Sequence, residues 1–318
     1  MVSMRTCAII GCGNVGATSA YALLQSGLFS RLLLLDANKA RAVGEAEDLA
    51  HAMPFLSPCE VMAVDYQALA EAGLIIIAAG AAQRVGETRL DLVRRNAEIF
   101  RDIVDNVTRY NSEAILLVVT NPVDILTELT RRLSGFPAHR VIGSGTVLDS
   151  ARLKHLIGKH LAVDPRQVHA FIIGEHGDSE LPVFSSANVS GIDLDHFCNT
   201  RCAACSASDL DRLFSMARDA AYRIIRDKGA TYYAIAEAVR RIVTAIVRDE
   251  SAILPISVHT GGVFGIYDLS MSLPAMLGAK GVERVLEIPL SREEHAALQR
   301  SATQLREVLS GLDVSPTT

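Results

Sequence analysis

Short apolar segments alternate with helix-like stretches through the first part of the chain. They have the sequences CAII, LLLL, VMAV, LIIIAA, ILLVV and VIG, at residues 7–10, 32–35, 61–64, 74–79, 115–119 and 141–143. A strand without polar alternation is buried on both faces, which is typical of a parallel sheet covered by helices on each side. The sequence therefore predicts an α/β fold built on a doubly wound parallel sheet.

The pattern changes after about residue 144. We expect a helix at 146–161, a strand at 168–173, long amphipathic helices at 209–226 and 232–248, antiparallel strands within 253–271 and a final helix at 291–311 that a capping box begins. A chain of 318 residues is long for one domain. We therefore predict a doubly wound domain at 1–143 and an α+β domain at 144–318.

The composition excludes several classes of protein. Hydrophobic residues make up 49% of the chain and charged residues 21%, which is typical of a folded globular protein. The net charge is −5 and the basic residues are scattered, so we expect no nucleic-acid partner. The apolar segments are shorter than the roughly 18 to 20 residues that cross a membrane, so we expect no membrane association. Six cysteines and no recognisable export signal favour a cytoplasmic protein with free thiols.

A glycine-rich motif follows the first strand directly. In GCGNVG, Gly11, Gly13 and Gly16 lie between the strand and the next helix, and Asp36 ends the second strand twenty residues later. Such glycines let a pyrophosphate approach backbone N–H groups at the helix start, and the carboxylate can accept hydrogen bonds from the ribose hydroxyls. The arrangement predicts a Rossmann domain that binds NAD rather than NADP. The alternative is close packing of helix and sheet with no ligand.

Three further motifs contain polar residues suited to chemistry. Asp149 and Arg152 lie three apart on a predicted helix, so they share one face, although such a pair alone is most often a surface ion pair. His176 lies in a polar loop directly after a predicted strand, where exposure and a tunable pKa suit proton transfer. Arg89 lies in the segment GETRLDLVRRN.

Together the motifs resemble the NAD-dependent 2-hydroxy-acid dehydrogenases of the L-lactate and malate dehydrogenase family. In chain order they are GCGNVG, LLLLDAN, AAGAAQRVGETRLDLVRRN, VVTNPVD, GTVLDSAR, GEHGDSE and KGAT. The resemblance implies an enzyme that transfers a hydride between NAD and a small 2-oxo or 2-hydroxy acid. It also implies a homotetramer. A sensor or structural protein that had lost the activity would be expected to lack at least one of the polar residues above.

The resemblance also implies a role for each polar residue. His176 would exchange a proton with the substrate oxygen, while Asp149 would orient its ring and favour its charged form. Arg152 would bind the substrate carboxylate, and Arg89 would polarise the carbonyl after a loop closes. The implied substrate-binding residues are Gln83, Arg89, Asn121, Arg152 and Thr231, and the implied cofactor-binding residues are Gly11, Gly13, Val15, Gly16, Asp36, Gly80, Ala81, Val119 and Asn121.

The choice of substrate depends on the position six residues before Arg89. Malate dehydrogenases of the family have an arginine there, which pairs with a second carboxylate, whereas this chain has Gln83. A dicarboxylate beside a neutral amide would leave a buried charge without a partner. We therefore expect reversible reduction of pyruvate to L-lactate. The alternative is another L-2-hydroxy acid, either malate or one like 2-hydroxyisocaproate.

Two more residues correspond to an effector site of the family. Many bacterial lactate dehydrogenases bind fructose 1,6-bisphosphate between subunits through an arginine and a histidine, and this chain has Lys154 and His169 at those positions. A lysine holds phosphate only as a point charge, and His169 would help mainly when protonated. The alternative is that Lys154 is a solvated helix residue and His169 an ordinary strand side chain.

Three cysteines, Cys198, Cys202 and Cys205, have a spacing that can hold an iron–sulfur cluster. The same spacing places three small apolar residues on one face of a helix. We favour the helix and expect no metal, since hydride transfer needs none.

Overall fold

The computed structural model describes residues 2–81, 89–201 and 206–312. In the first part of the chain the elements are β1 (Ser3–Ile10), α1 (Asn14–Ser26), β2 (Arg31–Leu35), α2 (Lys39–His51), β3 (Glu60–Ala63), β4 (Ala72–Ile77), α3 (Arg89–Tyr110), β5 (Ile115–Val118), α4 (Val123–Ser134) and β6 (Val141–Gly143). Strands β1 to β6 pair in parallel in the order β3-β2-β1-β4-β5-β6.

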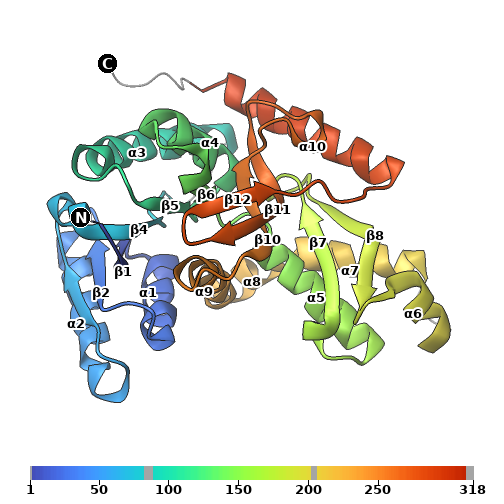
Figure 1. Cartoon of the computed structure of the whole chain (residues 1–318), viewed down its shortest axis with the longest axis horizontal. Coiled ribbons are helices and arrows are strands. Elements are labelled where there is room, and N and C mark those ends of the chain that lie inside the picture. Colours follow the sequence, from blue (N-terminus) through green and yellow to red (C-terminus); the bar gives the residue numbers. More distant parts are fainter. Residues whose placement is uncertain (1, 82–88, 202–205, 313–318) are drawn as a thin grey trace.

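Both faces of the parallel strands are covered, as their apolar sequences predict. In β1, Cys7 and Ile9 pack into a core that includes residues of α1 and α2, whereas Ala8 and Ile10 pack into a second core with α3 and α4. This alternation follows from the two-residue period of a strand. Figure 1 shows α1 and α2 on one side of the sheet and α3 and α4 on the other. The predicted doubly wound α/β fold is confirmed.

The second part of the chain contributes more helices and strands. They are α5 (Val147–Leu161), β7 (Val168–Ile173), β8 (Leu181–Val189), β9 (Ile192–Asp193), α6 (Leu194–Arg201), α7 (Ala207–Arg218), α8 (Ala220–Lys228), α9 (Tyr233–Val247), β10 (Ala252–His259), β11 (Ser270–Gly278), β12 (Gly281–Val285) and α10 (Arg292–Ser310). Short 3-10 turns lie at Met53–Phe55, Tyr66–Glu71, Ala138–Arg140, Pro165–Gln167 and Val263–Gly265.

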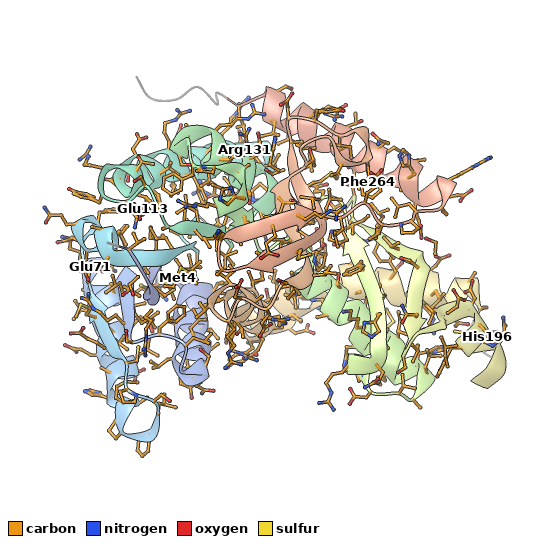
Figure 2. The ribbon with its side chains drawn as sticks, viewed as in Figure 1. Met4, Glu71, Glu113, Arg131, His196 and Phe264 are labelled. Atoms are coloured by element: carbon orange, nitrogen blue, oxygen red, sulfur yellow. The ribbon has the colours of Figure 1, made fainter. Side chains whose placement is uncertain are left out.

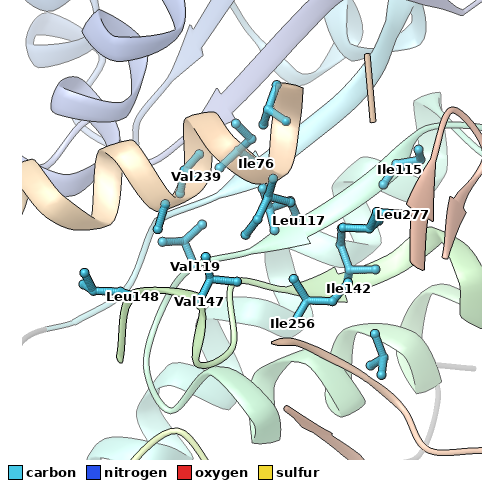
Figure 3. Close-up of a cluster of buried hydrophobic side chains, with 14 of the residues drawn as sticks. Ile76, Ile115, Leu117, Val119, Ile142, Val147, Leu148, Val239, Ile256 and Leu277 are labelled. Carbon is cyan, nitrogen blue, oxygen red and sulfur yellow. The ribbon is translucent and has the colours of Figure 1, made fainter. Parts of the chain in front are cut away.

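The antiparallel strands expected near the end of the chain extend the main sheet. Strand β10 pairs with β6 at Ser257 and Gly143, and β11 and β12 follow it outward. An edge strand leaves backbone groups without partners, so β10 gives the short strand β6 the pairing it lacks. Figure 3 shows the core beside this junction, where Leu117, Ile142 and Ile256 lie near one another.

A smaller antiparallel sheet, β7-β8-β9, packs against α5, α6 and α7 around a third core. It lies at the opposite end of the molecule from β2 and α2 (Figure 1). Side chains fill the spaces between these layers (Figure 2).

One helix prediction was partly wrong. The helix expected at 209–226 is interrupted, because α7 ends at Arg218 and α8 begins at Ala220. The residue between them, Asp219, has ψ near zero and its side chain pairs with Arg218 at 3.1 Å. Aspartate is a weak helix former in a helix interior, and it favours such a junction.

The capping box predicted for the final helix is confirmed. The Ser291 hydroxyl accepts a hydrogen bond from the Glu294 N–H at 3.2 Å, and the Glu294 carboxylate accepts one from the Ser291 N–H at 2.8 Å. The pair satisfies two N–H groups that the helix start leaves free. It therefore fixes where α10 begins.

Candidate functional site

A cleft of about 900 Å³ lies at the carboxyl ends of β1, β2 and β4. Several of the predicted cofactor-binding residues line it, namely Gly11, Gly13, Asp36, Gly80 and Ala81. Ligands of open α/β sheets bind at this edge, where loops leave the strands. The cleft is therefore a suitable place for a dinucleotide.

Two glycines of the motif have different surroundings. A Cβ on Gly16 would lie 1.8 Å from the Gly11 carbonyl oxygen, so only glycine lets the helix start this close to the turn. A Cβ on Gly13 would meet no atom of the described residues within 4 Å, and Gly13 lines the cleft. A side chain there would occupy space that a pyrophosphate needs. The turn is thus closely packed at Gly16 and open to the cleft at Gly13.

Asp36 is held in place by backbone groups at the end of β2. One carboxylate oxygen accepts a hydrogen bond from the Cys12 N–H at 2.7 Å, and the other accepts one from the Asn38 N–H at 2.8 Å. The carboxylate lines the cleft in this fixed orientation. It can accept hydrogen bonds from ribose hydroxyls and would repel a phosphate in their place.

The cleft does not include every predicted cofactor-binding residue. Val15, Gly16, Val119 and Asn121 are absent from its lining among the described residues. Asn121 lies at the end of β5, and its carbonyl oxygen accepts a hydrogen bond from the Asn96 side chain at 3.1 Å. The same side chain accepts one from the Ala81 N–H at 2.8 Å. Asn96, which the sequence analysis missed, therefore joins the segments after β4 and β5.

The residues predicted for proton transfer are in direct contact. The His176 Nδ1 lies 2.6 Å from one oxygen of Asp149, and the Arg152 guanidinium donates to the other oxygen at 2.8 Å. Asp149 is 2% exposed, so this is a buried pair rather than the surface pair that its spacing alone suggests. The histidine side chain remains 25% exposed.

Hydrogen bonds between α5 and β7 bring these residues together. The Thr146 hydroxyl at the start of α5 donates to the Ile172 carbonyl oxygen at 2.5 Å, and the Ser150 hydroxyl accepts from the Ile172 N–H at 2.8 Å. Asp149 lies in the first turn of α5, where the helix dipole favours a negative charge. His176 follows the end of β7, so the same hydrogen bonds place it against Asp149.

The loop that contains His176 is held by three other elements. The His176 N–H donates to Asp124 of α4 at 2.7 Å, and the Glu175 N–H donates to Ser301 of α10 at 2.8 Å. Gly174 exchanges two backbone hydrogen bonds of 2.9 Å with Ser272 of β11. The histidine loop is thus hydrogen-bonded to α4, α10 and β11. The role of Asp124 was missed, because nothing local in VVTNPVD connects it to residue 176.

Electrostatics favour the charged form of the imidazole. Burial lowers the pKa of His176, but the charge of Asp149 and the hydrogen bond to it raise the pKa more, to about 9. Burial raises the pKa of the Asp149 carboxyl, yet the charges of His176 and Arg152 bring that pKa below its usual range. The pair can therefore hold a proton for donation at neutral pH.

Two other buried carboxyl groups lie close to this pair. Burial raises the pKa of Asp124 to about 6, against the hydrogen bonds that it accepts. Burial and the charge of Asp149 raise the pKa of Glu180 to about 8. Glu180, just before β8, is 7% exposed and was also missed by the sequence analysis.

Three predicted substrate-binding residues have not yet been placed, namely Gln83, Arg89 and Thr231. Gln83 lies outside the described residues, and so does the side chain of Arg89, which begins α3. Thr231 is half-buried just before α9. Within the part of the chain that the structure describes, no hydrogen bond joins Thr231 to the histidine.

The two effector candidates lie on and beside β7. His169 is exposed, and alternation along the strand places it on the same face as Phe171. The Lys154 ammonium lies 5.9 Å from the centre of the Phe171 ring, and burial lowers its pKa. Both candidates are therefore associated with one face of the strand.

The cysteine segment is only partly described. Cys198 is 2% exposed and packs in the third core, which agrees with the apolar helix face that we favoured. Cys202 and Cys205 lie outside the described residues.

Among the helices that the structure describes, none is long and apolar enough to span a membrane.

Comparisons with known proteins agree with this geometry. Residues 6–143 match the lactate/malate dehydrogenase, NAD binding domain, and residues 146–312 match the lactate/malate dehydrogenase, alpha/beta C-terminal domain. The chain is 51% identical over 311 residues to an L-lactate dehydrogenase of Thermoanaerobacter pseudethanolicus, covering 98% of this chain and 100% of the relative. It is 49% identical over 307 residues to one of Acetivibrio thermocellus, covering 96% of each.

Solved structures are similar over the same length. A lactate dehydrogenase from a Medee basin deep-sea metagenome library has a TM-score of 0.94 and 42% identity, covering 96% of this chain and 98% of that one. A minor L-lactate dehydrogenase from Enterococcus mundtii has a TM-score of 0.94 and 39% identity, covering 97% and 98%. The chain therefore belongs to the lactate/malate dehydrogenase family of oxidoreductases, and its cofactor is NAD.

Proposed function

We propose that the protein is an L-lactate dehydrogenase that reversibly reduces pyruvate to L-lactate. The observation that carries this proposal is the contact of His176 with Asp149, whose second oxygen binds Arg152. The set unites a proton donor, the group that orients it and a cation suited to a carboxylate. The relatives named above are L-lactate dehydrogenases, which supports the same substrate.

The chain's own residues would work as follows. The hydrogen bond from Nδ1 to Asp149 fixes the ring, so Nε2 faces the substrate and donates its proton to the keto oxygen of pyruvate. Arg152 binds the carboxylate of pyruvate, and Arg89 polarises the carbonyl. Bound NADH supplies the hydride that the carbonyl carbon receives. In the reverse direction neutral His176 accepts the hydroxyl proton of L-lactate.

The proposed binding residues follow the same division. Gly11, Gly13, Asp36, Gly80 and Ala81 would hold the cofactor in the cleft, with Val15, Gly16, Val119 and Asn121 beside it. Gln83, Asn121 and Thr231 would contact the substrate. The cofactor domain would span 1–143 and the substrate domain 144–318, close to the limits of the two family matches.

The preference for pyruvate rests on the neutral amide of Gln83. A second carboxylate beside it would be buried without a cation, which is costly. Malate and bulkier L-2-hydroxy acids remain the alternative substrates.

An assay of NADH absorbance tests the proposal. We expect rapid loss of absorbance with pyruvate, slower loss with oxaloacetate and with the branched acid 4-methyl-2-oxopentanoate, and a product with L configuration. A faster reaction with either competing acid would assign the enzyme to that substrate.

Assembly, location and regulation are further parts of the proposal. We propose a cytoplasmic homotetramer, since family members are usually tetramers and Cys7, Cys12 and Cys59 form no disulfide within the described part of the chain. Fructose 1,6-bisphosphate would bind Lys154 and His169. A titration in which the bisphosphate leaves pyruvate affinity unchanged would count against that regulation.

A further inference from the structure

The carboxyl group of Glu180 is buried beside the proton-transfer pair and has no part in the mechanism described so far. Its side chain is 7% exposed, and its Oε1 has no hydrogen-bond partner among the described residues. Carboxylate and ring atoms of Asp149, His176 and Glu180 lie within 4.8 Å of one another. A buried acid without a partner is costly in its charged form, so it favours retention of a proton.

The charges around Glu180 come from several elements. Asp149 and Arg152 face it from α5, His176 from the loop after β7 and Arg218 from α7. Arg218 is itself paired with Asp219 at 3.1 Å, and Arg152 with Asp149 at 2.8 Å. Asp124 of α4 accepts a hydrogen bond from the His176 N–H in the same site. Each cation near Glu180 therefore already has an acidic partner.

We propose that Glu180 is a positioning residue that controls the charge of His176: it is uncharged at neutral pH and, once ionised, stabilises the imidazolium. The inference rests on the proposed function, because it concerns the proton that His176 gives to the substrate. While Glu180 is uncharged, Asp149 is the one acidic partner of Arg152 among the described residues. The guanidinium can then still attract a substrate carboxylate. When Glu180 ionises in the alkaline range, its charge delays the loss of the histidine proton. The residue thus extends the proton-donating range of His176 upward in pH.

The direct test is an NMR titration of the His176 imidazole in the whole enzyme without substrate. Its resonance is identified by its disappearance in His176→Asn. We expect the pKa of His176 to be lower in Glu180→Gln than in the wild type by more than about half a pH unit, since glutamine keeps the shape but not the charge. Asp178→Asn is the matched control, because Asp178 lies in the same loop but is exposed and therefore screened. We expect a clearly smaller shift in that variant.

Thermal unfolding of the wild type and of Glu180→Gln at several pH values checks that the charge of Glu180, rather than its shape, is responsible for the effect. Because burial raises the pKa of Glu180 to about 8 from the ordinary 4.5, wild-type stability falls as pH rises between those values. Glutamine removes that loss, so Glu180→Gln should have a higher Tm than the wild type in the alkaline range. An alkaline limb of the kcat profile at lower pH in Glu180→Gln would agree with the titration.

An unchanged pKa of His176 in Glu180→Gln would overturn the inference, and so would an equal shift in Asp178→Asn. The titration needs no turnover, so it is independent of the substrate. Failure of the wild-type enzyme to reduce pyruvate would instead count against the proposed function.

Discussion

At the scale of single residues, the site depends on one buried carboxylate. Asp149 binds His176 with one oxygen and Arg152 with the other, so it would join the proposed proton donor to the proposed carboxylate-binding residue. The motifs that resemble the dehydrogenase family predicted all three residues, whereas the spacing of Asp149 and Arg152 alone suggested only a surface ion pair. They could not predict Asp124 or Glu180. Asp124 is 52 positions from His176 in the chain, and its contact appears only when α4 packs beside the loop after β7.

Substitution of Asp149 by asparagine tests this role. The charge of Asp149 raises the pKa of His176, so Asp149→Asn should lower that pKa. Pyruvate reduction needs the imidazolium, so the alkaline limb of the pH–rate profile should move to lower pH. Since a general acid typically contributes about 10² to 10⁴ in rate, we expect kcat at neutral pH to fall by at least about tenfold. A profile that keeps its alkaline limb would show that Asp149 does not control the histidine.

Substitution of Gln83 tests the preference for pyruvate. In Gln83→Arg a cation would face the second carboxylate of oxaloacetate, so the ratio of kcat/KM for oxaloacetate to that for pyruvate should rise by at least about tenfold. Gln83→Glu is the matched control, since its negative charge should lower the ratio. Equal ratios in both variants and the wild type would show that residue 83 does not face the substrate side chain.

At the scale of elements, the turn between β1 and α1 uses one glycine, Gly16, for close packing and another, Gly13, to leave space in the cleft. The sequence predicted the turn well, because its glycines and the apolar strand before it are local signals. It predicted α7 and α8 less well, because Asp219 interrupts a pattern that is otherwise helical. It did not indicate that β10 would pair with β6, since strand pairing depends on which edge is left open.

Two alanine substitutions in this turn should have opposite consequences. Gly13→Ala adds a Cβ in open space, so the free energy of unfolding should change by less than about 0.5 kcal/mol while NADH binds more weakly. Gly16→Ala places its Cβ 1.8 Å from the Gly11 carbonyl oxygen, so it should destabilise the fold by more than about 1 kcal/mol. Urea unfolding and a fluorescence titration with NADH measure the two effects. Loss of stability without weaker binding in Gly13→Ala would contradict the account.

At the scale of the whole molecule, the main sheet contains strands from both parts of the chain. Helix α9 places Val239, Ile242 and Val243 in the same core as Cys7 and Ile9 of β1. Elements that share a sheet and a core stabilise one another, so the two parts should unfold together. The family matches divide the chain near residue 143, but this shared core could not be predicted from the sequence because it joins residues more than two hundred positions apart.

Equilibrium unfolding measures this cooperation. Far-UV circular dichroism and near-UV circular dichroism from the tyrosines should give coincident urea transitions for the full chain. A fragment of residues 1–143 lacks α9 and β10, so it should bind a hydrophobic dye and unfold without cooperativity. A fragment that unfolds cooperatively at the same urea concentration as the full chain would show that its core is complete without the second part.

In the proposed reaction His176, held by Asp149, gives a proton to pyruvate as NADH is oxidised. A single-turnover experiment with enzyme in excess over pyruvate tests it most directly. The wild type should oxidise one NADH for each pyruvate and form L-lactate, while His176→Asn should bind NADH equally well but react at least about 100-fold more slowly. A wild type that leaves NADH unoxidised would show that the protein does not reduce pyruvate, and a His176→Asn variant that reacts at the wild-type rate would show that His176 is not the proton donor.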